Sequence, residues 1–170
     1  MQGSRSPSLT QADAFEVIKE AFSSLADDPA FDLVQGSTTP EGDARLDVKV
    51  RRKGAVFPAP YVFVVTPTRK VRAFADEGAA RLERVTAPAE SDLERLDARG
   101  AVLRCKDELS AIVPNLYALF PRYAFYSPGT GRWEVLTGLL TRPDTGLNQY
   151  ALEVLPDGRV DSVKRVGTAW

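Results

Sequence analysis

The stretch that most constrains the fold is residues 149–166, which reads QYALEVLPDGRVDSVKRV. Two runs of β-forming residues flank the pair Asp157-Gly158, which suits a two-residue type I′ turn because both central residues of that turn need positive φ. The pattern predicts a β-hairpin whose two runs pair antiparallel. In that register Leu152 lies opposite Val163, and both side chains are expected on the buried face.

A second stretch, residues 60–74 (PYVFVVTPTRKVRAF), repeats the order of the hairpin with a constant offset. Tyr61 falls where the hairpin has Tyr150, and Pro67 falls where it has Pro156. Each stretch follows two further strand-like runs, and each group of runs follows an apolar-periodic helix. The repeat predicts a tandem duplication, and a chance match between two β-rich segments is the alternative.

Two stretches have the apolar spacing of amphipathic helices. The first begins after Thr10, a residue type suited to the N-cap, and is expected to end near Leu25. The second is expected over residues 107–120, with Asp107 as its N-cap and a kink or restart at Pro114.

These patterns divide the chain into four segments. Residues 1–8 are predicted to be a disordered N-terminus, 9–75 a first unit of a helix plus an antiparallel sheet, 76–105 an irregular or helical connector, and 106–170 a second unit of the same kind. Within the connector, Gly100 is expected to end a short helix and residues 101–105 to form a strand.

The order of elements predicts an α+β class with two helix-plus-four-stranded antiparallel sheet units. As a pattern of elements only, each unit resembles the helix-plus-curled-sheet layout of cystatin-like modules. No sequence motif in the chain supports membership of that family, and a shared fold would leave the function open.

The chain has no histidine and a single cysteine. Without histidine it lacks the usual metal ligand and the usual general base near neutral pH. Motifs of phosphate-binding loops, zinc sites and nucleophile elbows are absent as well. One cysteine allows no intramolecular disulfide, and no run approaches the ~18 consecutive apolar residues of a membrane helix. We therefore expect a soluble cytoplasmic protein with no cofactor, no metal and no membrane association.

The charge of the chain is balanced, with Lys+Arg 22 against Asp+Glu 23 and a net charge of −1. Nucleic-acid-binding domains usually carry a basic excess, so no nucleic-acid partner is expected. Lys49 and Arg51 nevertheless share one face of an alternating strand, and Arg69 and Arg72 follow in the next hairpin. If the sheet brings these four together, they form a patch for a small anionic ligand; the alternative is a solvated strand face.

Two aromatic residues are candidates for a binding surface. Phe57 lies in the turn GAVFPAP, and Trp133 follows the turn SPGTGR. Exposed aromatic residues and arginine dominate the binding energy of protein interfaces, and loops on a sheet scaffold often carry recognition. The alternative is that Phe57 caps the sheet and that Trp133 belongs to the core. The candidate binding residues are therefore Phe57, Trp133, Lys49, Arg51, Arg69 and Arg72.

These observations favour a non-enzymatic protein-binding module, such as an inhibitor, an immunity-type neutraliser or an assembly adaptor. One alternative is a small-molecule-binding protein, or an enzyme that uses Asp, Glu or Tyr in a pocket between helix and sheet. A structural subunit of a larger assembly is a third interpretation. A pocket lined by a buried carboxylate would favour small-molecule binding, whereas an exposed aromatic patch would favour protein binding or assembly.

Overall fold

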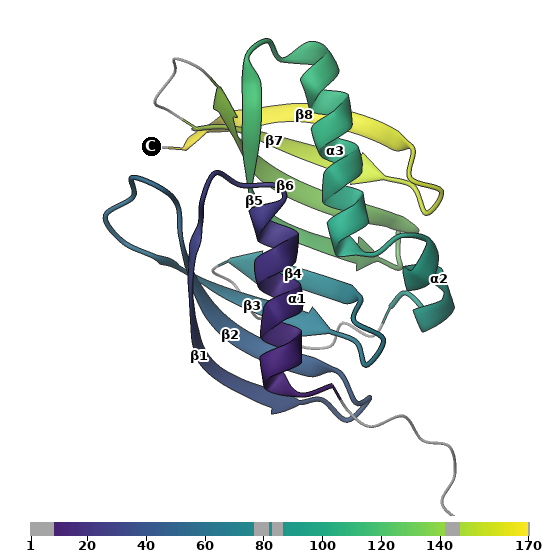
Figure 1. Ribbon diagram of the computed structural model, residues 1–170. Helices are drawn as coiled ribbons and strands as arrows, with labels where there is room; N and C mark the ends of the chain where they lie inside the picture. The colour runs from purple at the N-terminus through teal and green to yellow at the C-terminus, as the bar shows by residue number, and fades with distance from the viewer. Residues whose placement is uncertain (1–8, 77–81, 83–86, 142–146, 170) are drawn as a thin grey trace, which may run out of the picture.

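The computed structural model describes residues 9–76, 82, 87–141 and 147–169. Its elements are α1 (Gln11–Ser23), β1 (Ala30–Thr38), β2 (Ala44–Arg51), β3 (Ala59–Val65), β4 (Val71–Asp76), α2 (Glu90–Arg95), α3 (Ala98–Ile112), β5 (Leu116–Ser127), β6 (Arg132–Thr141), β7 (Leu147–Val154) and β8 (Val160–Ala169). The eight strands form one antiparallel sheet in chain order. Helices α1 and α3 lie on the same face of it, α1 over β1–β3 and α3 over β4–β8 (Figure 1). The predicted disorder of residues 1–8 lies outside the described residues.

The α+β class is confirmed, with one eight-stranded antiparallel sheet and two long helices. The predicted two-unit duplicated layout and the cystatin-like pattern are not confirmed, because a single sheet replaces two separate ones. The two halves of this sheet join at β4 and β5 through only two residue pairs, Phe74 with Ala124 and Ala75 with Tyr123. The sheet is therefore continuous but weakly joined at its centre.

The hairpin of β7 and β8 pairs as predicted at Leu152 and Val163, but its turn differs. Only Gly158 has positive φ, and the Leu155 N–H donates to the Arg159 carbonyl oxygen at 2.9 Å, so the loop holds three residues. Pro156 disfavours the predicted two-residue turn because proline has no backbone N–H to donate to the Arg159 carbonyl oxygen, as the residue before such a turn does. A bulge next to Glu153 absorbs the extra residue and restores the predicted register.

The predicted burial of both hairpin side chains is correct for one of them. Leu152 is buried in the core. Val163 is 37% exposed, because β8 is an edge strand with a neighbour on one side only. Which strand residues become buried therefore depends on the helices that cover the sheet as well as on the alternation of side chains along the strand.

Helix α1 begins as predicted, since the Thr10 hydroxyl oxygen accepts a hydrogen bond from the Asp13 N–H. Its Phe22 side chain is almost fully buried. The ring of Phe22 packs edge-on against five other aromatic rings, those of Phe31, Tyr61, Phe63, Phe74 and Phe120. Since Phe120 comes from β5, this cluster also ties the first half of the sheet to the second.

The second long helix is shifted relative to the prediction of residues 107–120. Helix α3 begins after Asp97, whose Oδ1 accepts from the Gly100 N–H at 3.0 Å and whose Oδ2 accepts from the Val71 N–H at 2.9 Å. The predicted N-cap at Asp107 and the predicted strand over residues 101–105 are wrong, and Gly100 lies in the first helical turn. The buried stripe of α3 is built largely from small residues, Ala98, Ala101, Val102, Cys105 and Leu109, which a search for large apolar side chains underweights.

The C-terminal part of the predicted helix is a strand. α3 ends at Ile112, Asn115 adopts φ of 63°, and β5 begins at Leu116. Pro114 thus separates a helix from a strand instead of kinking a helix, because it cannot supply the backbone donor that a further turn needs. The aromatic residues that follow Pro114 suit a strand better than a helix.

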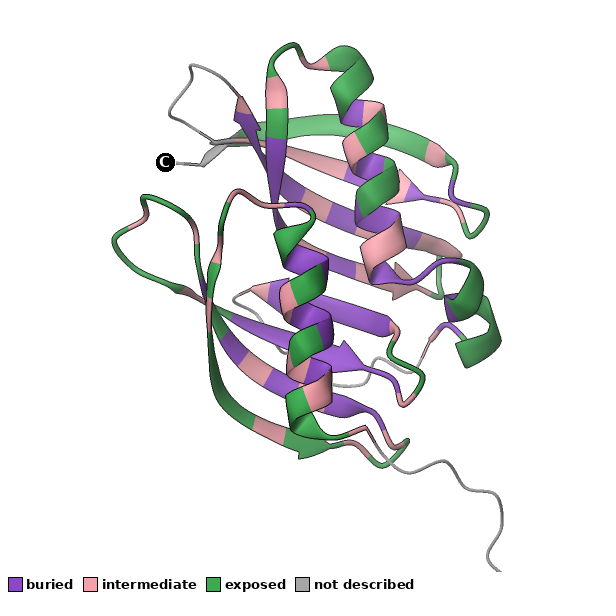
Figure 2. Cartoon of the chain, viewed as in Figure 1, coloured by how far each residue is buried: buried purple, intermediate pink, exposed green. Residues whose placement is uncertain are grey.

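The two faces of the sheet differ in what covers them (Figure 2). In β2 the side chains of Leu46, Val48 and Val50 are buried on the helix-covered face. Lys49 and Arg51 are exposed on the opposite face, as the alternation predicts. The loop between β2 and β3 extends beyond the sheet and is largely exposed, so it is available for contact.

Candidate functional site

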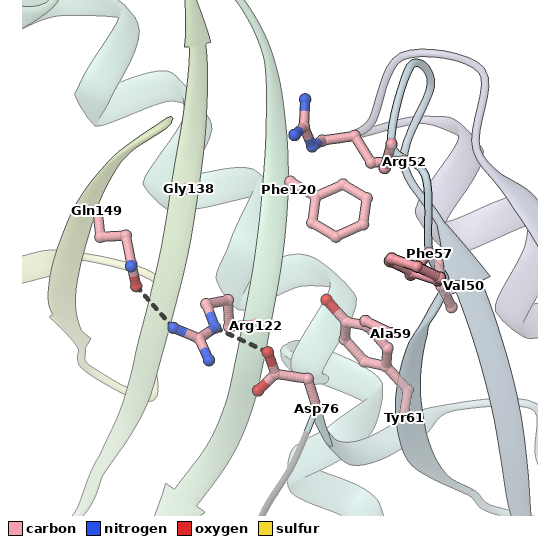
Figure 3. Close-up of a pocket in the computed structure, with 11 residues that line it drawn as sticks. Val50, Arg52, Phe57, Ala59, Tyr61, Asp76, Phe120, Arg122, Gly138 and Gln149 are labelled. Atoms are coloured by element: carbon pink, nitrogen blue, oxygen red, sulfur yellow. Dashed lines mark hydrogen bonds and ion pairs between the residues drawn. The ribbon is translucent and has the colours of Figure 1, made fainter. Parts of the chain in front are cut away.

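A pocket opens where the two halves of the sheet separate. β4 ends at Asp76, while β3 and β5 both continue past this point, so the two strands have no partner strand between them. The resulting cavity has a volume of about 110 Å³ and is lined from both halves of the sheet (Figure 3). We call it the β3–β5 pocket; its walls are formed by the β2–β3 loop, β3, β4, β5, β6 and β7.

One wall of the β3–β5 pocket is apolar. Val50 and Ala59 are paired across β2 and β3, and the ring of Phe120 faces them from β5. Tyr61 closes the floor, with its hydroxyl donating to the Pro121 carbonyl oxygen at 2.7 Å. Burial, and to a lesser degree the charge of Asp76, raises the pKa of Tyr61 well above its ordinary value, so this phenol stays neutral.

The opposite wall is polar. The Arg122 Nε lies 2.7 Å from Asp76 Oδ2, and Arg122 Nη1 donates to Gln149 Oε1 at 3.1 Å. These three side chains come from β5, β4 and β7, and the first two are mostly buried. Because Asp76 pairs with Arg122, the two charges largely cancel within this wall.

Arg52 adds a further cation at the pocket opening. It belongs to the β2–β3 loop and extends toward the same opening as Phe120 (Figure 3). No carboxylate in the part of the chain that the structure describes lies within ion-pair distance of its guanidinium. The described charged side chains that line the pocket, Arg52, Arg122 and Asp76, therefore sum to a net charge of +1.

Phe57 lies exposed in the β2–β3 loop. Its side chain is 82% exposed, and that of the neighbouring Val56 is 81% exposed. Gly54, with φ of 82°, and a hydrogen bond from the Ala55 N–H to the Arg52 carbonyl oxygen shape the turn that presents them. The alternative in which Phe57 caps the sheet is therefore wrong, since the ring lies at the rim of the pocket and largely in solvent.

The four predicted basic residues do not form one patch. Lys49 and Arg51 are exposed on the open face of β2 near the β2–β3 loop. Arg69 lies in the β3–β4 turn, beyond the other end of β2, where its guanidinium is 3.7 Å from Asp13. Strand direction explains the separation, because the chain reverses between Arg51 and Arg69 and carries the second cluster to the far end of the sheet.

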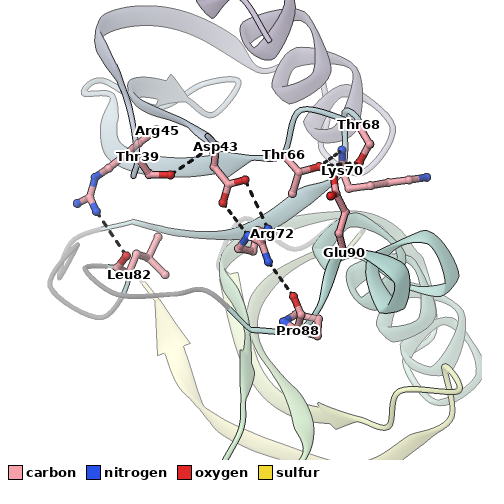
Figure 4. A network of polar contacts seen from close by, with 10 residues as sticks. All are labelled: Thr39, Asp43, Arg45, Thr66, Thr68, Lys70, Arg72, Leu82, Pro88 and Glu90. Atoms are coloured by element: carbon pink, nitrogen blue, oxygen red, sulfur yellow. Dashed lines mark hydrogen bonds and ion pairs between the residues drawn. The ribbon is translucent and has the colours of Figure 1, made fainter. Parts of the chain in front are cut away.

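Arg72 is buried and belongs to the interior (Figure 4). Its Nε lies 2.8 Å from Asp43 Oδ2, and its Nη1 donates to the Pro88 carbonyl oxygen at 2.7 Å. The prediction that Arg72 lies on an exposed basic face is corrected, since a buried guanidinium needs these partners and finds them inside the fold. Its role in this structure is to hold the chain at Pro88 against β4.

Trp133 is also a core residue. It is 1% exposed, pairs with Val154 of β7, and packs edge-on against Tyr126 with 5.8 Å between the ring centres. The predicted exposure of this ring is therefore corrected. Alternation in β6 places Trp133 and Val135 on the same buried face, and proximity to a turn does not change which way a strand side chain points.

Cys105 lies fully buried in α3. Burial, followed by the charge of Glu108, raises the pKa of its thiol far above the ordinary value, so the nucleophilic thiolate is disfavoured. Over residues 9–76, 82, 87–141 and 147–169, no three acidic or cysteine side chains converge in a way that would hold a metal ion. Among the described helices, none is long and apolar enough to cross a membrane.

Sequence reasoning missed the polar wall of the pocket. Asp76, Arg122 and Gln149 are far apart in the chain and carry no motif. One local signal existed, since Arg122 is a charged residue within an otherwise aromatic and apolar strand. Comparison with known proteins finds no family model, no curated protein and no solved structure that matches this chain.

Proposed function

We propose that the protein is a non-enzymatic protein-binding module that contacts its partner through the β2–β3 loop. The observation that carries the proposal is the exposure of two consecutive apolar side chains, Val56 at 81% and Phe57 at 82%. An exposed aromatic ring on a loop contributes favourable free energy chiefly when a binding partner buries it. An inhibitor, an immunity-type neutraliser or an assembly adaptor would each use such a surface.

The loop is held by a rigid base. β2 and β3 pair from Ala44 opposite Val65 to Val50 opposite Ala59, directly up to the loop. A loop that leaves a regular hairpin loses less conformational freedom when it binds than a disordered segment does. Lys49 and Arg51 precede the loop and Lys53 lies within it, so the partner surface we expect is apolar at its centre and acidic at its rim.

The test compares single substitutions in the loop with the same substitution elsewhere. The proteins that wild type captures from the native cell lysate are quantified by mass spectrometry against those captured by Val56→Ala and Phe57→Ala. Val163→Ala is the matched control, because Val163 is 37% exposed on β8, at the opposite edge of the sheet from β1. Partners retained by the control and lost by both loop variants support the proposal; equal capture by all four proteins contradicts it.

A second candidate function is the binding of a small molecule in the β3–β5 pocket. The specific observation in its favour is the mostly buried carboxylate of Asp76 beside Arg122 in a cavity lined largely by apolar groups. An enzyme is a weaker form of this alternative, since Asp76 is already paired with Arg122 and Tyr61 already donates to Pro121.

A tandem duplication and a cytoplasmic location are part of the same proposal. One long helix followed by four strands occurs twice, as α1 with β1–β4 and as α3 with β5–β8. That order supports the duplication, and a superposition of the two halves with matching strand order tests it. The single cysteine, which needs no oxidising compartment, supports the location, and microscopy of a tagged chain tests that.

A further inference from the structure

We infer that the β3–β5 pocket binds a small organic carboxylate whose body is a single apolar ring. The inference rests on the small-molecule alternative of the proposed function and is independent of protein binding by the loop. Three features of the pocket carry it: its size, its apolar wall and its unbalanced positive charge.

The size and the apolar wall set the body of the ligand. The cavity holds about 110 Å³ and is bounded by Val50, Ala59 and the rings of Phe57 and Phe120. A closed apolar cavity of roughly 150 Å³ accepts benzene. The β3–β5 pocket is smaller, at about 110 Å³, and has room for one ring at most because it also opens to solvent. Aromatic walls favour a flat body that stacks or packs edge-on.

The charge of the pocket sets the head group. Asp76 neutralises Arg122, whereas Arg52 has no carboxylate within ion-pair distance among the residues described. Tyr61 adds no negative charge, since burial raises its pKa and keeps it protonated. A carboxylate at the opening would pair with the planar fork of Arg52, and a cationic ligand would find that Asp76, the one carboxylate among the described lining residues, already pairs with Arg122.

The polar wall adds a second constraint on the ligand. Gln149 accepts a hydrogen bond from Arg122 through Oε1, which leaves its amide N–H₂ as the donor beside the cavity. The polar end of the described lining can therefore offer a ligand the N–H donor of the Gln149 amide. A ligand with acceptor oxygens fits this end better than one with N–H groups.

Phenylacetate and phenylacetamide are the probes that test this inference. They share the ring and differ in the charge of the head group. Binding of each to the full chain is measured by titration calorimetry, and backbone amide shifts of Ala59 and Gly138 report whether the pocket is the site. The variants are Arg52→Gln and, as the matched control, Lys53→Gln, which removes the same charge from a neighbouring residue that does not line the pocket.

We expect phenylacetate to bind wild type about fivefold more tightly than phenylacetamide. This is the gain in affinity expected from one partly exposed, charge-assisted hydrogen bond between the carboxylate and Arg52. Arg52→Gln should remove this preference, and Lys53→Gln should keep it. Equal affinity of the two probes, no saturable binding of phenylacetate, or equal weakening by both variants would overturn the inference. Failure of carboxylate binding would leave the protein-binding proposal standing, because protein capture is tested at Val56 as well as at Phe57, and Val56 does not line the pocket.

Discussion

The Tyr61 hydroxyl donates to the Pro121 carbonyl oxygen at 2.7 Å and thereby links β3 directly to β5. Further along these strands β4 lies between them, but it ends at Asp76 and pairs with β5 at only two positions. Proline has no backbone N–H, so its carbonyl oxygen is the one main-chain group of that residue that needs a partner. The phenol supplies that partner in place of the missing strand.

Replacing Tyr61 with phenylalanine should lower the free energy of unfolding by about 1–3 kcal/mol, because the buried Pro121 carbonyl loses its donor. Urea denaturation of the purified chain measures this. Tyr150→Phe is the control, since the Tyr150 hydroxyl makes no hydrogen bond to any described residue. A Tyr61→Phe variant as stable as the control would show that water replaces the phenol at no cost.

Stability should fall in alkaline solution. The pKa values of Cys105 and Tyr61 are raised from ordinary values of 9.0 and 10.0, chiefly by burial. Above these values the unfolded chain loses protons that the folded chain retains, so stability is complete below pH ~9 and declines as the pH rises further, by up to ~1.4 kcal/mol per pH unit for each group.

Melting temperatures recorded across this range test the alkaline prediction. In Cys105→Ala the loss of stability should begin nearer pH ~10, because of the two buried groups only Tyr61 then remains to titrate. Identical profiles for wild type and Cys105→Ala would mean that the thiol titrates at its ordinary pKa and is reached by water in the folded state.

The buried pair of Asp43 and Arg72 should be one of the most sensitive positions in the chain. Asp43→Ala removes the charged partner of the buried Arg72 guanidinium, while the neutral Pro88 carbonyl oxygen remains as an acceptor. Breaking a buried pair in this way costs about 3–5 kcal/mol. Glu16→Ala breaks the exposed pair with Lys19 and should change stability by less than roughly 1 kcal/mol in the same denaturation experiment. Similar effects of both substitutions would contradict the burial of Arg72.

Trp133 and Phe57 should respond in opposite ways to truncation. Trp133→Ala removes a fully buried ring and should cost about 3–5 kcal/mol. Phe57→Ala removes a ring that is largely in solvent and should change stability by less than about 0.5 kcal/mol. Thermal unfolding of both variants is the measurement. A large loss of stability in Phe57→Ala would mean that its ring packs on the sheet in solution.

The strand pattern could be predicted from the sequence because alternation depends on neighbouring residues alone. This alternation predicted that Leu152 pairs with Val163 and which residues of β2 are buried or exposed. Both predictions are confirmed. The start of α3 was missed because its signal lies in the cap at Asp97 and in small buried residues, which contribute little to an apolar pattern. Whether two halves make one sheet or two depends on long-range pairing, which local patterns do not report.

The candidate site was less predictable than the fold. Phe57 was predicted as a candidate from its position in a turn, and the structure places it in solvent. Trp133 was predicted from its position next to a turn and Arg72 from a possible basic patch, yet Trp133 packs against Tyr126 and Arg72 pairs with Asp43 in the interior. The β3–β5 pocket exists because β4 is shorter than its neighbours, and that difference appears only when the strands are assembled.

The central claim, that the β2–β3 loop is the contact surface, is tested most directly by site-specific cross-linking. A photoreactive phenylalanine analogue replaces Phe57 in one variant and Ile112, which is exposed at the end of α3, in another. Irradiation in the native cell should give a discrete cross-linked partner from position 57 and none from position 112. The same partner from both positions, or no cross-link from position 57, would contradict the claim.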